Sequence, residues 1–525
     1  MDTPKIIKKR LDHLHEYFFA GTAEDEIEQL SEIFVSDPEL RLRLRDPRNR
    51  FHVIIGVKGV GKSALLHDEH RYAKSVGVSV FLKPDDISVP FDKSEGALAS
   101  IKRKLFAALM GAAAAELGEQ LGGKLTDYTD QVLRSEALRE GSATPDFIER
   151  LSALLANTTK LTDKVDLSKA LAGDNPSRSI NTLYRAVSKH LDSNDTPLSI
   201  FIDDTDQIAS PDEEDQLNRI WGVILAAREM TLKLKKARVL ISLRSNIWAR
   251  LKTAQRGQLD QIDHINPHIT VLDCDERMLE QIFLRRIDAG ARLAREGGID
   301  CPGKSGLVCF FESRQVSLPE ASEQQRSWAG FISKVARNRP RDLIQFVAKL
   351  IDKSREKDII SQTVVESAMQ EYSNERVDYL NAEFGLEFQP LTNMVKSLSK
   401  LPVDEVEFEL LRTRLESIPA EFSVTVRGRT LHPGRKESTV DLLAAFFEIG
   451  ILNARIVDKT KSKGYDHKTF QRFPNLVSNA NWNEIQGYRW EVHPAYRSYL
   501  HALRRERERA TNIKVKFPPK PRHDR

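Results

Sequence analysis

The chain has 525 residues, which is too long for a single hydrophobic core, so about two to four domains are expected. Hydrophobic residues make up 40% of the chain and charged residues 30%, which excludes disordered and fibrous classes, and no apolar run approaches the roughly 20 residues of a membrane-spanning helix. The net charge of +4 is nearly balanced, so total charge does not by itself predict a nucleic-acid binder.

The first half of the chain alternates helical and strand patterns. Residues 1–50 have apolar side chains at helical spacing and predict an N-terminal helical segment. Residues 51–270 alternate short apolar strands with helices, which predicts an α/β fold with a parallel sheet. A mostly helical stretch at about 95–195 is expected to be an insertion between core strands. The strands are expected at residues 52–55, 78–82, 198–202 and 238–243.

The second half of the chain changes character. Residues 271–384 are nearly all helical in pattern and predict a helical lid, whereas residues 385–503 mix helices with short strands and predict a separate small domain. Residues 504–525 contain nine Lys/Arg against three Asp/Glu and three prolines, so a flexible basic tail is expected. Such a tail is either a solvated end or an arm that binds a polyanion.

The cysteines and histidines predict no further site. Cys274, Cys301 and Cys309 are too few for a disulfide framework and lack the paired spacing of a metal site. None of the 13 histidines belongs to a convincing metal cluster. The N-terminus lacks the apolar core of a secretory signal, so we expect a cytoplasmic protein without a membrane partner.

The residues after the first predicted strand match the pattern G-x-x-x-x-G-K-[ST]. Glycines let the backbone curl so that N–H groups point at a phosphate, and the following helix presents its positive end to the same anion. Lys62 is expected to neutralise the β- and γ-phosphates, and the Ser63 hydroxyl to bind Mg²⁺. The alternative is a glycine turn without a ligand. The residues expected to hold the phosphates are Gly56, Val57, Lys58, Gly59, Val60, Gly61, Lys62, Ser63 and Ala64.

Two carboxylates follow the apolar strand at 198–202. Ligands bind at the carboxyl ends of strands in open parallel sheets, so this pair is expected near the phosphates, on a strand neighbouring the glycine-rich turn. Asp203 is expected to hold Mg²⁺ through water and Asp204 to polarise the attacking water, with Asp206 as the alternative base. The competing interpretation is an acidic pair at an ordinary turn.

Polar residues also follow the strand at 238–243. They are expected to lie beside the γ-phosphate, where Asn246 or Ser245 orients water and Arg244 contacts phosphate or a neighbouring subunit. The alternative is a strand end that faces solvent.

These motifs, together with the segment Asn338-Arg-Pro-Arg-Asp-Leu343, resemble the AAA+/STAND branch of P-loop ATPases, and more narrowly a group of bacterial P-loop ATPases. The resemblance implies ATP as the nucleotide and assembly into a homo-oligomer or with a partner protein. It also implies that Arg341, or alternatively Arg339, reaches the γ-phosphate from the lid. Many AAA+ enzymes have Glu at the position of Asp204, and in this feature the chain is similar to STAND ATPases, which act as slow switches.

The region 385–503 is similar to a winged helix, with a helix that ends at Gly450 and wing strands at 451–457 and 488–492. In relatives of the origin-recognition type this module contacts DNA, although other winged helices dock proteins or are purely structural. The side chains expected to contact phosphates are Lys459, Lys461, Lys463, Lys468 and Arg472.

Three functions are therefore considered. The first is an ATP-hydrolysing switch or remodeller that acts on DNA or in antiviral defence. The second is a non-catalytic, nucleotide-gated scaffold that binds a protein partner. A small-molecule kinase is the third and fits less well, because a compact kinase needs neither the long lid nor the C-terminal module.

Overall fold

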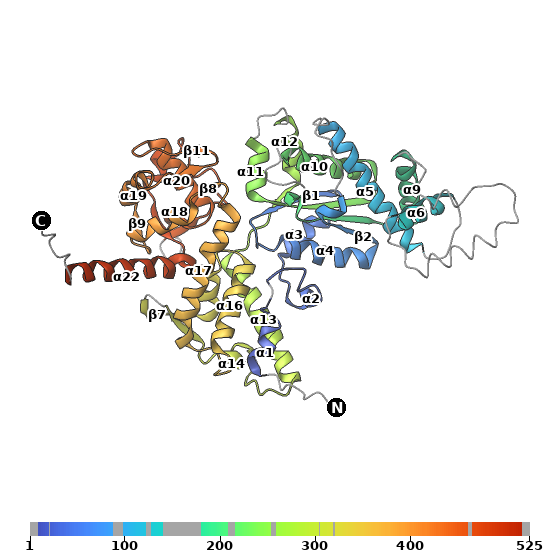
Figure 1. The fold of residues 1–525 in the computed structure, drawn as a ribbon. Helices are drawn as coiled ribbons and strands as arrows, with labels where there is room; N and C mark the ends of the chain where they lie inside the picture. Colours follow the sequence, from blue (N-terminus) through green and yellow to red (C-terminus); the bar gives the residue numbers. More distant parts are fainter. Residues whose placement is uncertain are drawn as a thin grey trace, which may run out of the picture. The chain divides into compact units, whose positions relative to one another are not determined.

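The computed structural model describes residues 9–19, 21–87, 98–121, 128–139, 180–207, 216–253, 259–303, 305–318, 321–459 and 465–516. The chain divides into two compact units (Figure 1). The core unit comprises Phe34–Leu272, and the lid unit comprises Met1–Ile33 and Asp273–Arg525. Within the insertion expected at about 95–195, residues 95–97, 122–127 and 140–179 lie outside the described residues.

The core unit is built on a five-stranded sheet in the order β2-β3-β4-β1-β5. Every neighbouring pair in it is parallel, which confirms the predicted parallel α/β core. The fifth strand was not predicted, because three residues are too few to show a pattern. The strands are β1 (Phe51–Gly56), β2 (Val78–Leu82), β3 (Leu198–Ile202), β4 (Ala237–Arg244) and β5 (Ile269–Val271).

Helices cover both faces of this sheet because successive strand residues point to opposite sides. Val53 and Ile55 of β1 belong to the larger hydrophobic cluster, with residues of three helices: α5 (Leu98–Gln120), α9 (Ile180–Ser193) and α10 (Gln216–Lys233). Ile54 belongs to the cluster of the opposite face, with α3 (Pro38–Leu44) and α4 (Lys62–Val76). The other helices of the unit are α6 (Tyr128–Arg139), α11 (Ser245–Thr253) and α12 (Leu259–Ile265).

The observed strand order corrects one prediction. We expected Asp203 to follow a strand next to the one that leads into the glycine-rich turn. In the structure β4 lies between these two strands, so that β1 and β3 each pair with β4 and not with each other. The sequence pattern of each strand is local, whereas the pairing order depends on contacts between distant segments.

The lid unit is mainly helical in its first half. Its elements there are α1 (Arg10–His15), α2 (Leu30–Ile33), α13 (Glu276–Glu296), α14 (Leu307–Phe310), β6 (Gln315–Leu318), β7 (Ala321–Ser327), α15 (Trp328–Val335), α16 (Pro340–Ser354) and α17 (Val365–Phe384). The antiparallel hairpin of β6 and β7 replaces the helix that we expected there. Its largely polar sequence has no apolar periodicity from which a strand could be predicted.

The second half of the lid unit combines helices with short antiparallel strands. They are β8 (Phe388–Gln389), α18 (Leu391–Ser397), β9 (Val406–Glu407), α19 (Phe408–Glu421), β10 (Thr425–Val426), β11 (Arg429–Thr430), α20 (Lys436–Glu448), β12 (Leu452–Val457), β13 (Tyr465–Lys468), α21 (Trp482–Ile485), β14 (Arg489–Val492) and α22 (Pro494–Lys516). Strands β12 and β14, predicted as the wing, pair antiparallel in a sheet of order β13-β12-β14-β9.

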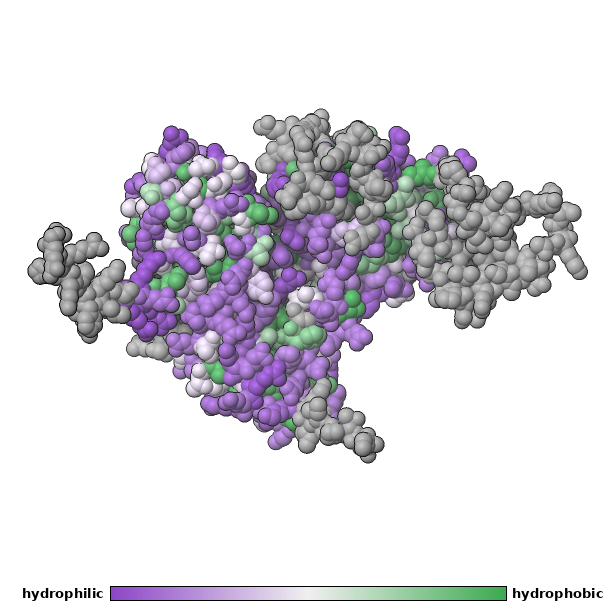
Figure 2. Space-filling view, viewed as in Figure 1, coloured by the Kyte–Doolittle hydropathy of each residue, from purple (hydrophilic) through white to green (hydrophobic). Residues whose placement is uncertain are grey.

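Two further expectations need correction. Residues 504–516 continue helix α22 and are not a flexible tail, because the prolines that prevent a helix all lie beyond Lys516. Cys301 and Cys309 form a disulfide, since the turn between α13 and α14 brings them together, while Cys274 is free and buried. None of the helices in the described part of the chain combines the length and apolarity that crossing a bilayer requires. The visible surface is mainly hydrophilic, with scattered hydrophobic residues (Figure 2).

Candidate functional site

The glycine-rich turn lies between β1 and α4, as predicted. Gly59 and Gly61 have φ angles of +81° and +103°, in the left-handed region that glycine adopts without strain. A side chain at Gly56 would place its Cβ 2.7 Å from Val60, so the turn also needs glycine there for space. Helix α4 begins at Lys62, which places its N-terminus directly after the turn. The sequence thus builds the strand, turn and helix of a phosphate-binding loop.

Lys62 is held beneath this loop. Its side chain is buried, and its Nζ donates hydrogen bonds to the carbonyl oxygens of Gly56 at 3.0 Å and Val57 at 3.1 Å. Burial lowers the pKa of Lys62 to about 8, although the nearby carboxylate of Asp206 acts in the opposite direction. An anion bound in the loop would favour the charged lysine. Ser63, the next residue, is half-buried in the first turn of α4.

Asp203 directly follows β3 and is completely buried. Its Oδ1 accepts a hydrogen bond from the hydroxyl of Ser242, whereas its Oδ2 is buried without a hydrogen-bond partner among the described residues. A buried carboxylate oxygen without a donor is costly. A water bound to a divalent cation would supply that donor, so Asp203 fits the predicted role at Mg²⁺.

Ser242 is the site residue that the sequence analysis missed. It belongs to β4, opposite Ile54 of β1, and is fully buried. Besides donating to Asp203, its Oγ accepts a hydrogen bond from the backbone N–H of Asp204 at 3.1 Å. The signal that could have revealed it is a lone hydroxyl within the apolar run of its strand.

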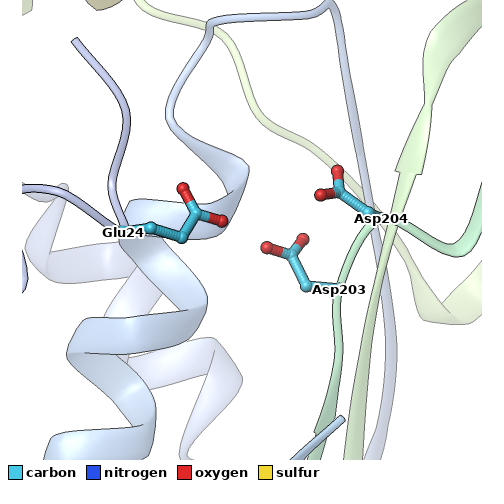
Figure 3. A group of neighbouring side chains, drawn as sticks. All are labelled: Glu24, Asp203 and Asp204. Carbon is cyan, nitrogen blue, oxygen red and sulfur yellow. The ribbon is translucent and has the colours of Figure 1, made fainter. Parts of the chain in front are cut away.

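Asp204 turns the chain away from the sheet. Its φ of 46° is left-handed, a conformation that aspartate tolerates better than most residues, and a 3-10 helix (Thr205–Gln207) follows. The carboxylate oxygens of Asp203 and Asp204 lie within 4.8 Å of each other at the end of β3 (Figure 3). Two carboxylates at this distance repel each other, and a bound cation relieves that repulsion. The third residue labelled in the figure, Glu24, belongs to the lid unit.

Arg244 is the last residue of β4 and lies opposite Gly56 of β1, beside the phosphate-binding loop. Its Nε donates to Asp206 Oδ2 at 2.7 Å, so this ion pair joins the end of β4 to the segment after β3. Asp206, the alternative base predicted from sequence, is therefore held in an ion pair with this arginine. Ser245 and Asn246 open helix α11 and are half-buried.

The remaining predicted residues lie in the lid unit. Arg339 is buried just before α16, and Arg341, in its first turn, donates from Nε to the carbonyl oxygen of Gly21 at 3.0 Å. Because the phosphate-binding loop belongs to the core unit, their role at the γ-phosphate stays a prediction.

The predicted DNA contacts also lie in the lid unit. Arg472 pairs with Asp273 at 2.7 Å, and the Nζ of Lys468 lies 4.0 Å from the ring centroid of Phe473. Lys459 follows β12, whereas Lys461 and Lys463 lie outside the described residues. DNA contact by these side chains therefore stays a prediction.

Comparison with known proteins identifies two regions. Residues 26–234, which contain both the phosphate-binding loop and the carboxylate pair, match the AAA ATPase domain family. Residues 312–381 match the FunZ-associated C-terminal helical domain. No curated protein matches the chain significantly.

Two solved structures illustrate the distant similarity. Cdc6p from Pyrobaculum aerophilum is 13% identical, with 96% of this chain and 97% of that chain covered and a TM-score of 0.33. The ORC2 protein of Aeropyrum pernix, in its ADPNP-ADP complexes, is 10% identical, with 92% and 94% covered and a TM-score of 0.37. Scores this low support no conclusion about function, so the family match and the site geometry carry the assignment. Residues 26–234 are thus similar to AAA ATPase domains, and the helical region 312–381 is similar to the FunZ-associated C-terminal helical domain.

Proposed function

We propose that the protein binds ATP with Mg²⁺ and hydrolyses it slowly, as a nucleotide-dependent switch of the AAA+/STAND type. One observation carries the proposal. The buried Asp203, with one carboxylate oxygen lacking a donor, is tied through Ser242 to β4, and β4 pairs directly with the strand that leads into the phosphate-binding loop. This arrangement supports a metal-bound triphosphate at the carboxyl ends of β1, β4 and β3.

Each side chain has a distinct task in this proposal. Backbone N–H groups of the loop and the charge of Lys62 bind the phosphates, and Ser63 and Asp203 hold Mg²⁺, which supplies charge neutralisation when bound. Asp204 orients the attacking water and accepts its proton. Asp206, which pairs with Arg244 at 2.7 Å, is the alternative base.

The residues after β4 and in the lid complete the proposal. Asn246 or Ser245 positions the water, and Arg244 reaches the γ-phosphate from the end of β4 when the nucleotide displaces its contact with Asp206. Arg341, or alternatively Arg339, stabilises the developing charge from the lid. Aspartate in place of the longer glutamate at position 204 supports slow turnover, because its carboxylate reaches less far.

The test separates hydrolysis from binding. In the Asp204→Asn variant we expect ATP affinity within about threefold of the parent but phosphate release reduced by about a hundredfold or more. The matched Asp206→Asn variant, measured in the same assays, should lose less activity. If the parent protein binds ATP tightly but releases no phosphate, the non-catalytic scaffold is the correct function. If ATP does not bind at all, both proposals fail.

We further propose that the C-terminal region contacts DNA. Arg505 and Arg509 are exposed on α22, and the segment 504–525 carries a net charge of +6 from nine basic and three acidic residues. Deleting this segment should weaken DNA binding and flatten its dependence on salt concentration, as measured by fluorescence anisotropy. An unchanged salt slope would exclude the segment, and chromatography in ATP and in ADP would test nucleotide-dependent oligomerisation.

A further inference from the structure

The turn that precedes α16 has an unusual backbone. Arg337 and Asn338 have φ angles of 51° and 56°, and two consecutive non-glycine residues in the left-handed region cost free energy that the surroundings must offset. The turn directs the Arg337 side chain into the interior, where it is 7% exposed. It also sets the position of Arg339 and Arg341, which follow within four residues.

Arg337 and Asp342 together join three helices of the lid unit. Its Nε and Nη2 donate to Asp342 Oδ2, each at 2.7 Å, within the first turn of α16. Its Nη1 donates to the phenolic oxygen of Tyr496 in α22, and its guanidinium lies 5.3 Å from the centroid of that ring. The other carboxylate oxygen of Asp342 accepts from Arg376 of α17 at 2.6 Å. One carboxylate and one phenol thus connect α16, α17 and α22.

The charges in this cluster depend on one another because Asp342, Arg376 and Tyr496 are buried and the side chain of Arg337 is almost fully buried. Burial favours a lower pKa for Arg337, but the adjacent carboxylate of Asp342 outweighs it and raises the pKa. Burial likewise favours a higher pKa for Asp342, yet Arg337 and Arg376 hold it below its usual value. Burial raises the pKa of Tyr496, so its hydroxyl stays neutral. Removing one member of such a buried set leaves the others without compensation.

A second contact reinforces the same junction. The backbone N–H of Tyr499, one turn further along α22, donates to the hydroxyl of Ser373 in α17 at 3.0 Å. Helix α22 directly follows β14, which belongs to the antiparallel sheet of the C-terminal region. A movement of that sheet would therefore act on Tyr496 and, through it, on the turn before α16.

We propose that Arg337, Asp342 and Tyr496 form a latch through which the C-terminal region sets the position of the first turn of α16. The latch residues are positioning residues, and they act through Arg339 and Arg341. The consequence for catalysis rests on the proposed ATPase function, because it requires one of these arginines to reach the nucleotide. Binding of DNA to the C-terminal region would then alter the rate of hydrolysis.

The first experiment needs no nucleotide. Hydrogen exchange of the full-length Tyr496→Phe variant, which keeps the aromatic ring, should be about tenfold faster at the backbone amides of residues 339–345. Tyr499→Phe is the matched control, because it removes a hydroxyl from the same helix outside the latch, and it should leave those amides unchanged. Equal exchange in the two variants would overturn the proposal.

The second experiment measures ATP turnover in the same proteins. Tyr496→Phe should lower kcat by about five- to tenfold with KM within twofold, because the latch orients a group that acts after ATP has bound. Arg337→Lys, which keeps the cation but loses the forked geometry, should show a similar loss. Faster exchange with unchanged kcat would overturn the link to catalysis. A parent protein without turnover would instead refute the ATPase proposal, and the exchange result would still decide whether the latch exists.

Discussion

Ser242 provides the sharpest test of the site, because its hydroxyl makes two hydrogen bonds that no other described residue replaces. It donates to the Asp203 carboxylate and accepts from the N–H of Asp204. A hydrogen bond to a charged group contributes about 1.5–3 kcal/mol and a neutral one about 1 kcal/mol. Ser242→Ala should therefore lower the free energy of unfolding by about 2–4 kcal/mol, and it should also misplace the carboxylate of Asp203.

The assay is urea denaturation of the full-length chain, alongside ATP turnover. Ser199→Ala is the matched control, since Ser199 is buried in β3 four residues before Asp203 and lies away from the strand end. We expect the free energy of unfolding to fall only slightly in the control and by the larger amount in Ser242→Ala. Turnover in Ser242→Ala should also be reduced tenfold or more. Equal shifts in the two variants would refute the reasoning that Ser242 holds the carboxylate.

Three further predictions concern the core unit. Lys62→Ala removes a cation from the phosphate-binding loop and should weaken ATP binding by about ten- to a hundredfold in equilibrium titrations, and unchanged affinity would contradict the assigned site. Burial lowers the pKa of His52 from 6.5 to about 4. Between these two pH values the unfolded chain therefore binds more protons than the folded chain, and the free energy of unfolding should fall by up to about 3 kcal/mol as pH drops from 7 to 4. The excess pH dependence of the urea midpoint should disappear in His52→Leu but persist in a variant of the exposed His264. Gly118→Ala would place a Cβ 2.2 Å from the carbonyl oxygen of Leu133 and force α5 and α6 apart. The variant should therefore have a lower melting temperature, and an unchanged melting temperature would show that the two helices do not pack as described.

Much of the core unit could be predicted from sequence because its signals are local. Apolar runs placed β1 to β4 within about two residues of their observed bounds, and the spacing of glycines, Lys62 and Ser63 located the phosphate-binding loop. These patterns reflect the burial of a whole strand and the backbone freedom of glycine, which depend on few neighbours. The hairpin of β6 and β7 had no such signal, because its residues are mostly polar.

Only the tertiary structure could decide which residues meet. In the sequence, Ser242 is only a single hydroxyl within an apolar strand, and its role becomes visible because β4 lies between β1 and β3. The sequence also allowed Arg244 to face solvent, whereas in the structure it pairs with Asp206. Arg337 and Tyr496 are 159 residues apart, and nothing in either local sequence indicates the other. The alternation of strand and helix was determined by the sequence alone, because it follows from the spacing of apolar residues along the chain. The order of the strands and the partners of buried polar groups were decided by the fold, because each buried donor or acceptor must be satisfied by whatever the packing brings near it.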